Sequence, residues 1–138
     1  MLALLAGCGG DKRMSKADYE HTINQSGRKL SAVFGTVDQN TTNLHQVAVR
    51  VARARRTLIA VTNDLDAVKP PKAAERPHAS LVVALRTLAA DLQKLAEAAD
   101  RNDAKAVTEA RARLATPGRQ LVAAIQQLQQ AGFAINTG

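Results

Sequence analysis

Apolar side chains recur at alternating intervals of three and four residues along four stretches of the chain, and this spacing constrains the fold most. Residues three or four positions apart lie on the same face of an α-helix, so each stretch can form one continuous apolar stripe. The stripes are Tyr19, Ile23, Ser26, Leu30, Val33 and Val37; Leu44, Val47, Val51, Ala54, Leu58, Val61 and Leu65; Leu81, Leu85, Leu88, Leu92, Leu95 and Ala99; and Val107, Ala110, Leu114, Leu121, Ile125 and Leu128. Four such stripes predict four helices that pack along their apolar faces.

The residues between the stripes favour helix ends and turns. Ser15 and Asp18 resemble a capping box, and the Asn-Thr-Thr-Asn run at 40–43 offers several helix caps. The Val-Lys-Pro-Pro-Lys run at 68–72 predicts an extended loop, because proline cannot continue a helix. Pro77 suits the first turn of the helix that follows.

The fourth stretch is interrupted by Pro117, which lacks the N–H group that an interior helical position donates. Thr116 can cap a fresh start there, so we expect a kink or break near Thr116–Pro117. The many alanines and only three aromatic residues also favour helices over strands. The sequence therefore predicts an all-α fold, an up-down-up-down antiparallel four-helix bundle, with a frayed tail at 133–138. The expected helices cover about residues 16–38, 43–66, 77–100 and 103–132.

The chain's only cysteine, Cys8, follows a short apolar segment. The Leu-Ala-Gly-Cys run at 5–8 resembles the bacterial lipobox, in which the cysteine is joined to diacylglycerol and becomes the mature N-terminus. The resemblance implies that 1–7 are the end of a signal peptide and that 8–15 form the lipidated cysteine and a flexible tether. Only seven residues precede Cys8 and none is basic, as expected if the true start codon lies upstream of Met1.

The densest charge cluster is the Arg-Val-Ala-Arg-Ala-Arg-Arg run at 50–56, in a chain whose net charge is +7. On a helix, Arg50, Arg53 and Arg56 share a face, whereas Arg55 turns aside. Guanidinium groups suit phosphate and carboxylate, and each arginine near an anionic membrane contributes about 1 kcal/mol. We therefore expect weak contact with anionic lipid or an envelope polymer; the alternative is a solvated helix flank.

No set of residues has the spacing of a catalytic site. His21, His45 and His78 fall in different predicted helices, without the Glu-x-x-His repeat of di-iron bundles, so surface or helix-end positions are expected for all of them. A metal site in which Asp64 or Asp66 joins a histidine pair is the alternative. The carboxylates fall off the stripes, and no nucleophile motif or phosphate-binding loop is present. The sequence predicts a protein that is not an enzyme and holds no metal or cofactor.

As a whole, the chain resembles the small all-helical lipoproteins of high-GC Gram-positive bacteria, on its lipobox, its Ala/Arg-rich composition and its helical body with a Pro-Pro loop. The resemblance implies a protein anchored through Cys8 to the extracytoplasmic face of the cell membrane. Its bundle would then be non-catalytic, with a binding or structural role, and neither a ligand nor a protein partner is implied. If Met1 is the true start and export fails, the alternative is a cytoplasmic basic bundle that binds nucleic acid or a protein. The near absence of base-stacking aromatic residues disfavours nucleic acid.

Overall fold

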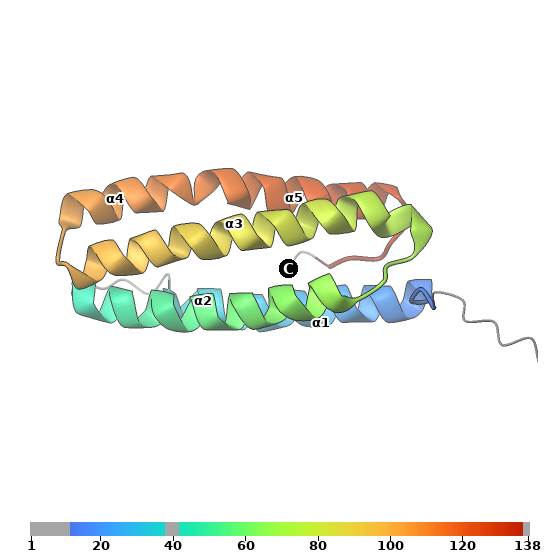
Figure 1. The fold of residues 1–138 in the computed structure, drawn as a ribbon, viewed down its shortest axis with the longest axis horizontal. Helices are drawn as coiled ribbons and strands as arrows, with labels where there is room; N and C mark the ends of the chain where they lie inside the picture. The colour runs from blue at the N-terminus through green and yellow to red at the C-terminus, as the bar shows by residue number, and fades with distance from the viewer. Residues whose placement is uncertain (1–11, 38–41, 137–138) are drawn as a thin grey trace, which may run out of the picture.

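The computed structural model describes residues 12–37 and 42–136, which form antiparallel helices joined by short connections (Figure 1). The helices are α1 at Lys16–Val37, α2 at Leu44–Ala67, α3 at Glu75–Asp100, α4 at Ala104–Arg113 and α5 at Ala115–Gln130, with a single 3-10 turn, η1, at Lys72–Ala74. α4 and α5 together form the fourth helix of the bundle. The predicted all-α four-helix bundle is confirmed, and no strand occurs in the described ranges.

Polar side chains cap the starts of α1, α2 and α4. Ser15 Oγ accepts a hydrogen bond from the Asp18 backbone N–H at 3.1 Å and donates to the Asp18 carboxylate at 2.6 Å. Asn43 and Asp103 accept from the backbone N–H groups three residues further on, at 3.2 and 2.9 Å. Each cap satisfies a backbone donor that has no partner inside the helix. Residues 38–41, which include part of the predicted capping run, lie outside the described residues.

The fourth helix is broken near Pro117, as predicted, but the break lies at Leu114 and Thr116 is not a cap. Pro117 has no N–H to donate to the Arg113 carbonyl, so the helical ladder is interrupted upstream of the proline. Leu114 N–H instead donates to the Arg111 carbonyl at 3.1 Å, in a tighter turn. The result is a bend of 21° in the fourth helix.

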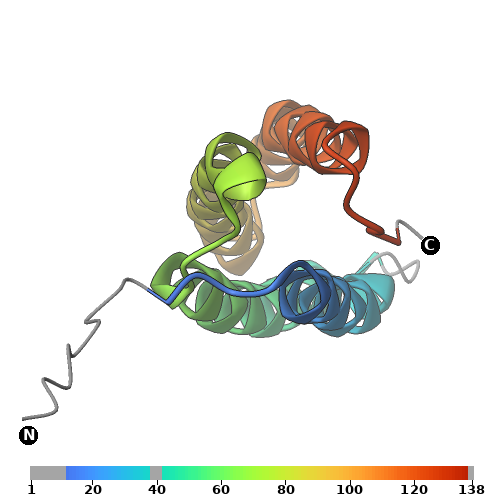
Figure 2. The ribbon, with the colours of Figure 1, turned by 90° about the vertical axis from the view of Figure 1, so that its right-hand side faces the viewer.

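Each helix packs on its neighbour in sequence: α1 on α2, α2 on α3, and α3 on both α4 and α5. The α2–α3 interface is the largest of these, whereas α1 and α5 are not closely packed on each other. Figure 2, seen along the helices, shows the ribbons of α1 and α5 set apart, with the C-terminal segment running between them. The bundle is therefore open along one side.

The core is concentrated between α2 and α3. Its most deeply buried leucines are Leu58, Leu65, Leu85, Leu92 and Leu95, joined by Leu128 of α5. On α1 only Tyr19 and Ile23 are buried, and the rest of its apolar stripe is half-buried. α1 thus contacts α2 along part of its stripe and leaves the remainder without a partner from the fourth helix.

Candidate functional site

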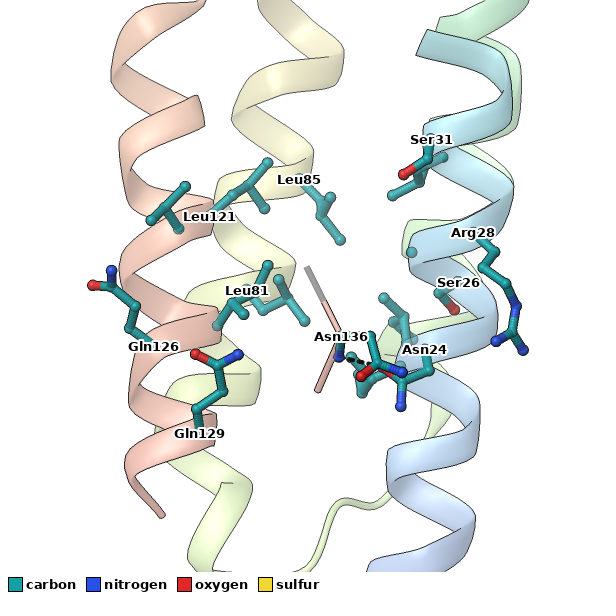
Figure 3. Close-up of a pocket in the computed structure, with 16 residues that line it drawn as sticks. Asn24, Ser26, Arg28, Ser31, Leu81, Leu85, Leu121, Gln126, Gln129 and Asn136 are labelled. Carbon is teal, nitrogen blue, oxygen red and sulfur yellow. Dashed lines mark hydrogen bonds between the residues drawn. The ribbon is translucent and has the colours of Figure 1, made fainter. Parts of the chain in front are cut away.

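A cavity of about 530 Å³ lies between α1 and α5, on the open side of the bundle (Figure 3). We call it the α1–α5 groove; its walls come from 23–31 of α1 and 121–129 of α5. Leu65 of α2 and Leu81 and Leu85 of α3 contribute the apolar side chains beneath them. The groove is therefore floored by leucines of the bundle core.

The α1 wall of the groove combines Ile23 and Leu30 with several small residues. Gly27 faces the cavity, and a Cβ atom added there would have no neighbour within 4 Å. Ser26 and Ser31 also line the wall, and Ser26 occupies a position of the apolar stripe. Gly27 therefore leaves space in the groove that a larger side chain could fill.

The α5 wall is apolar toward the floor and polar at the rim. Leu121 and Ile125 are half-buried, Val122 is 55% exposed, and Gln129 adds an amide. Arg28 of α1 is the charged member of the lining, and Figure 3 shows its side chain directed away from the cavity. The interior of the groove is therefore apolar and uncharged.

α5 ends in a turn that sends the chain back toward α1. Gly132 has a φ of 93°, in the left-handed region that glycine adopts without strain. Phe133 N–H donates to the Leu128 carbonyl at 3.1 Å, which closes the turn in the manner of a Schellman motif. The residues that follow are thereby directed across one end of the groove.

Residues 133–136, which we call the C-terminal strap, are packed against the bundle. The sequence pattern predicted a frayed tail here. Phe133 and Ile135 are only 5% and 6% exposed. The Phe133 ring lies edge-on to the Tyr19 ring, with 5.3 Å between their centroids. Gln129 of α5 donates to the Ile135 carbonyl at 2.9 Å. Two buried apolar side chains explain why this segment stays on the bundle.

Polar side chains of α1 hold the other edge of the strap. Asn24 donates to the Ala134 carbonyl at 2.9 Å and accepts from the Asn136 backbone N–H at 2.8 Å, the contact drawn in Figure 3. The Glu20 carboxylate accepts from the Ala134 N–H at 2.8 Å. The strap therefore bridges α1 and α5 at one end of the groove. Residues 137–138 of the predicted tail lie outside the described residues.

A buried hydrogen-bond chain next to the strap joins α1, α3 and α2. Tyr19 O–H donates to His78 Nδ1 at 3.0 Å, and His78 Nε2–H donates to the Leu65 carbonyl at 2.9 Å. This tautomer is assigned because a carbonyl can only accept. His78 lies in the first turn of α3, at a helix end as predicted, but it is only 6% exposed and so is buried, whereas His21 and His45 are exposed.

Burial determines the charge state of this pair. Desolvation lowers the pKa of His78, although the hydrogen bond to the Leu65 carbonyl and the charge of Asp66 partly oppose this effect. Desolvation also raises the pKa of Tyr19 above its ordinary value. Both side chains are therefore neutral near pH 7, and neither lines the groove. The pair holds three helices together.

The alternative metal site at the end of the bundle is not assembled among the described residues. Both ring nitrogens of His78 are engaged in hydrogen bonds. Asp66 accepts from Arg86 at 2.6 Å. In 12–37 and 42–136, no group of three or more His, Cys, Asp and Glu side chains lies close enough to hold a metal ion.

Comparison of the chain with protein-family models, curated proteins and solved structures finds no match. Neither the groove nor the strap was predicted. The signal for the groove in the sequence is the weak first stripe, where Ser26 stands at an apolar position and Gly27 and Ser31 lie beside it.

The arginine cluster of α2 is divided between the surface and a helix interface. Arg53 and Arg56 are exposed, and Arg50 is half-buried. Arg55 donates from Nε to the Ala89 carbonyl at 3.1 Å, which ties its side chain to α3. Arg55 thus turns aside, and the exposed positive charge of the cluster is greatest at Arg53 and Arg56.

The predicted lipobox, including Cys8, lies outside the described residues. The first described residues, 12–15, run from α1 toward the α2–α3 connection, on the side of the bundle away from the strap (Figure 2). Met14 N–H donates to the Lys69 carbonyl of that connection at 2.9 Å. Among the described helices, none is both long and apolar enough to span a membrane.

Proposed function

We propose that this protein is a lipid-anchored protein of the cell envelope whose bundle binds an apolar ligand in the α1–α5 groove and carries out no catalysis. The groove is the observation that supports the binding role, because it is a mainly apolar cavity of about 530 Å³ floored by core leucines. Ligand pockets have volumes of roughly 300–1,000 Å³, apolar walls and a few polar groups. A ligand that covers this surface removes apolar area from water, which stabilises the complex.

The lipobox-like run at 5–8 supports the anchor. The stretch from Cys8 to Ser15 reaches at most ~25 Å, at about 3.5 Å per residue. Residues 12–15 lie against the end of the bundle that carries the α2–α3 connection. An anchor on Cys8 therefore holds this end nearest the extracytoplasmic face of the membrane.

Contact between the arginine cluster and anionic lipid requires a particular orientation. Arg53 and Arg56 precede Ala67, the last residue of α2, by enough residues to lie roughly 17–21 Å from that end of the helix. This distance exceeds the Debye length of ~8 Å at physiological salt. The cluster therefore reaches an anionic lipid or envelope polymer when the outer face of α2 lies along the surface.

Metabolic labelling of the native host with a clickable fatty-acid analogue tests the anchor. The wild-type protein should carry the label and sediment with membranes, and Cys8→Ala should lose both properties because it has no thiol to acylate. Ser15→Ala is the matched control, since it alters the tether and leaves the lipobox intact. An unlabelled wild-type protein in the cytoplasm would reject the anchor and favour the cytoplasmic bundle instead.

A further inference from the structure

The size of the groove discriminates between possible occupants. One turn of a helix, about 10 Å across and 5.4 Å long, occupies roughly 400 Å³. The cavity of about 530 Å³ therefore has room for little more than one turn of a partner helix. A single extended alkyl chain is much narrower than a helix and can lie along the same apolar surface.

The shape and lining of the groove favour an elongated apolar ligand. Figure 3 places Asn136 of the strap toward one end of the lining residues and Leu121 and Leu85 toward the other, with Leu81 between them. Gly27 faces this floor from α1 and leaves space above it. A chain that lies between Gly27 and the floor leucines contacts apolar atoms along its length.

The charges around the groove favour an acidic head group. An ionised head group stays at the solvated rim, because transfer into an apolar cavity is too costly. Arg28 lies at that rim, and within the described part of the chain it forms no ion pair. The protein also carries a net charge of +7, which attracts anions.

Resting on the function proposed above, we infer that the α1–α5 groove binds a single acyl chain of an anionic amphiphile. The acyl chain lies on Leu81 and Leu85 beneath Gly27. The strap closes one end, so the chain enters through the open side between α1 and α5. Its acidic head group remains at the rim near Arg28. A free fatty acid and a membrane phospholipid both supply this chemistry.

Fluorescence titration of the full chain with dansylaminoundecanoic acid, a fluorescent fatty acid, tests the inference. Cys8→Ala is used as the parent so that no anchor of the protein's own competes. The parent should bind the probe saturably at one site, with a blue-shifted emission. Gly27→Leu places a branched side chain in the groove and should weaken binding at least tenfold.

Gly35→Leu is the matched control for Gly27→Leu. Both glycines lie within α1, a Cβ atom at either would have no neighbour within 4 Å, and only Gly27 lines the groove. Both changes raise helix propensity equally, so neither should unfold the protein. Gly35→Leu should therefore bind the probe as the parent does. Equal affinity of Gly27→Leu and Gly35→Leu would overturn the assignment to the groove.

Arg28→Gln tests the head group. It should lower the affinity for the fatty-acid probe severalfold and leave the affinity for the corresponding dansylated alcohol unchanged, because only the acid is charged. Competition for the bound probe then distinguishes the two sources of the acyl chain. Displacement of the probe by monomeric palmitate indicates a free fatty acid, and displacement by a short-chain phosphatidylglycerol indicates a membrane lipid. Displacement by neither would overturn the inference.

N-phenyl-1-naphthylamine, an uncharged apolar dye, distinguishes failure of this inference from failure of the proposed function. If the parent binds the dye but not the fatty acid, and Gly27→Leu abolishes binding of the dye, the groove is an apolar-ligand site but does not take an acyl chain. Binding of neither probe to a folded parent would reject both. If the parent forms a dimer and Gly27→Leu abolishes the dimer, the groove is occupied by a second copy of the protein.

Discussion

Tyr19→Phe isolates the contribution of the buried hydrogen-bond chain to stability. The substitution keeps the aromatic ring, and with it the edge-on packing against His78 and Phe133 at centroid distances of 5.6 and 5.3 Å. It removes the O–H group that donates to His78 Nδ1 at 3.0 Å. The Nδ1 lone pair is then left unpaired inside the protein, because the other ring nitrogen already donates to the Leu65 carbonyl.

A buried acceptor without a partner costs about 1–3 kcal/mol. For a chain of this length the corresponding decrease in melting temperature is roughly 3–5 °C per kcal/mol. Circular dichroism at 222 nm, followed through heat and urea unfolding at pH 7.5, measures both quantities. The helical signal of the folded variant should match that of the wild type, because no backbone hydrogen bond changes.

Thr62→Val is the matched control, since it also removes a buried hydroxyl. Thr62 is 3% exposed and donates to the Leu58 carbonyl at 2.6 Å. That carbonyl still accepts the helical N–H of residue 62 after the substitution, so no group is left unpaired. Thr62→Val should therefore cost less than about 1 kcal/mol. A Tyr19→Phe loss no larger than the Thr62→Val loss would refute the reasoning.

Two further predictions concern charge. Burial lowers the pKa of His78 in the folded state, so below about pH 6.5 the unfolded chain takes up a proton that the folded chain does not. The free energy of unfolding should therefore decrease as the pH is lowered, by up to about 1.4 kcal/mol per pH unit. Urea titrations at pH 7.0 and 5.5 should show a smaller pH effect for His78→Gln, and an unchanged effect would contradict this account. The unlipidated chain should co-sediment weakly with anionic vesicles and not with neutral ones, and the binding should fade as salt rises. Joint substitution of Arg50, Arg53 and Arg56 by Gln should reduce it, whereas Arg55→Gln should not because α3 holds that side chain; equal binding to both vesicle types would make the cluster a solvated flank.

Helix positions were the most predictable property of this chain. The observed ends of the bundle helices lie within two residues of the expected ones where those residues are described. Helical hydrogen bonds and caps connect residues at most a few positions apart, so Ser15, Asn43 and Asp103 could be recognised from their immediate neighbours. The interruption at Pro117 is equally local. The break lies at Leu114, just before the predicted Thr116–Pro117, because proline deprives a carbonyl four residues upstream of its donor.

The C-terminal strap depended on contacts that no local pattern contains. Phe133 and Ile135 follow the end of α5 and could not be distinguished from a frayed tail by periodicity. Phe133 is buried against Tyr19, more than one hundred positions earlier in the chain. Asn24 and Glu20 then pair with the backbone of the strap. Burial of His78 has the same origin, since its partners come from α1 and α2.

The sequence by itself determined that the chain forms helices, where they begin and end, and which face of each is apolar. Only the tertiary structure decided that the bundle is open between α1 and α5, that leucines of α2 and α3 floor the opening, and that the strap closes one end of it. An apolar stripe specifies the face that must be buried but not the element that buries it. Whether a fourth interface closes depends on side-chain volumes summed over several helices, and at Gly27 the α1 side of this interface contributes no side chain.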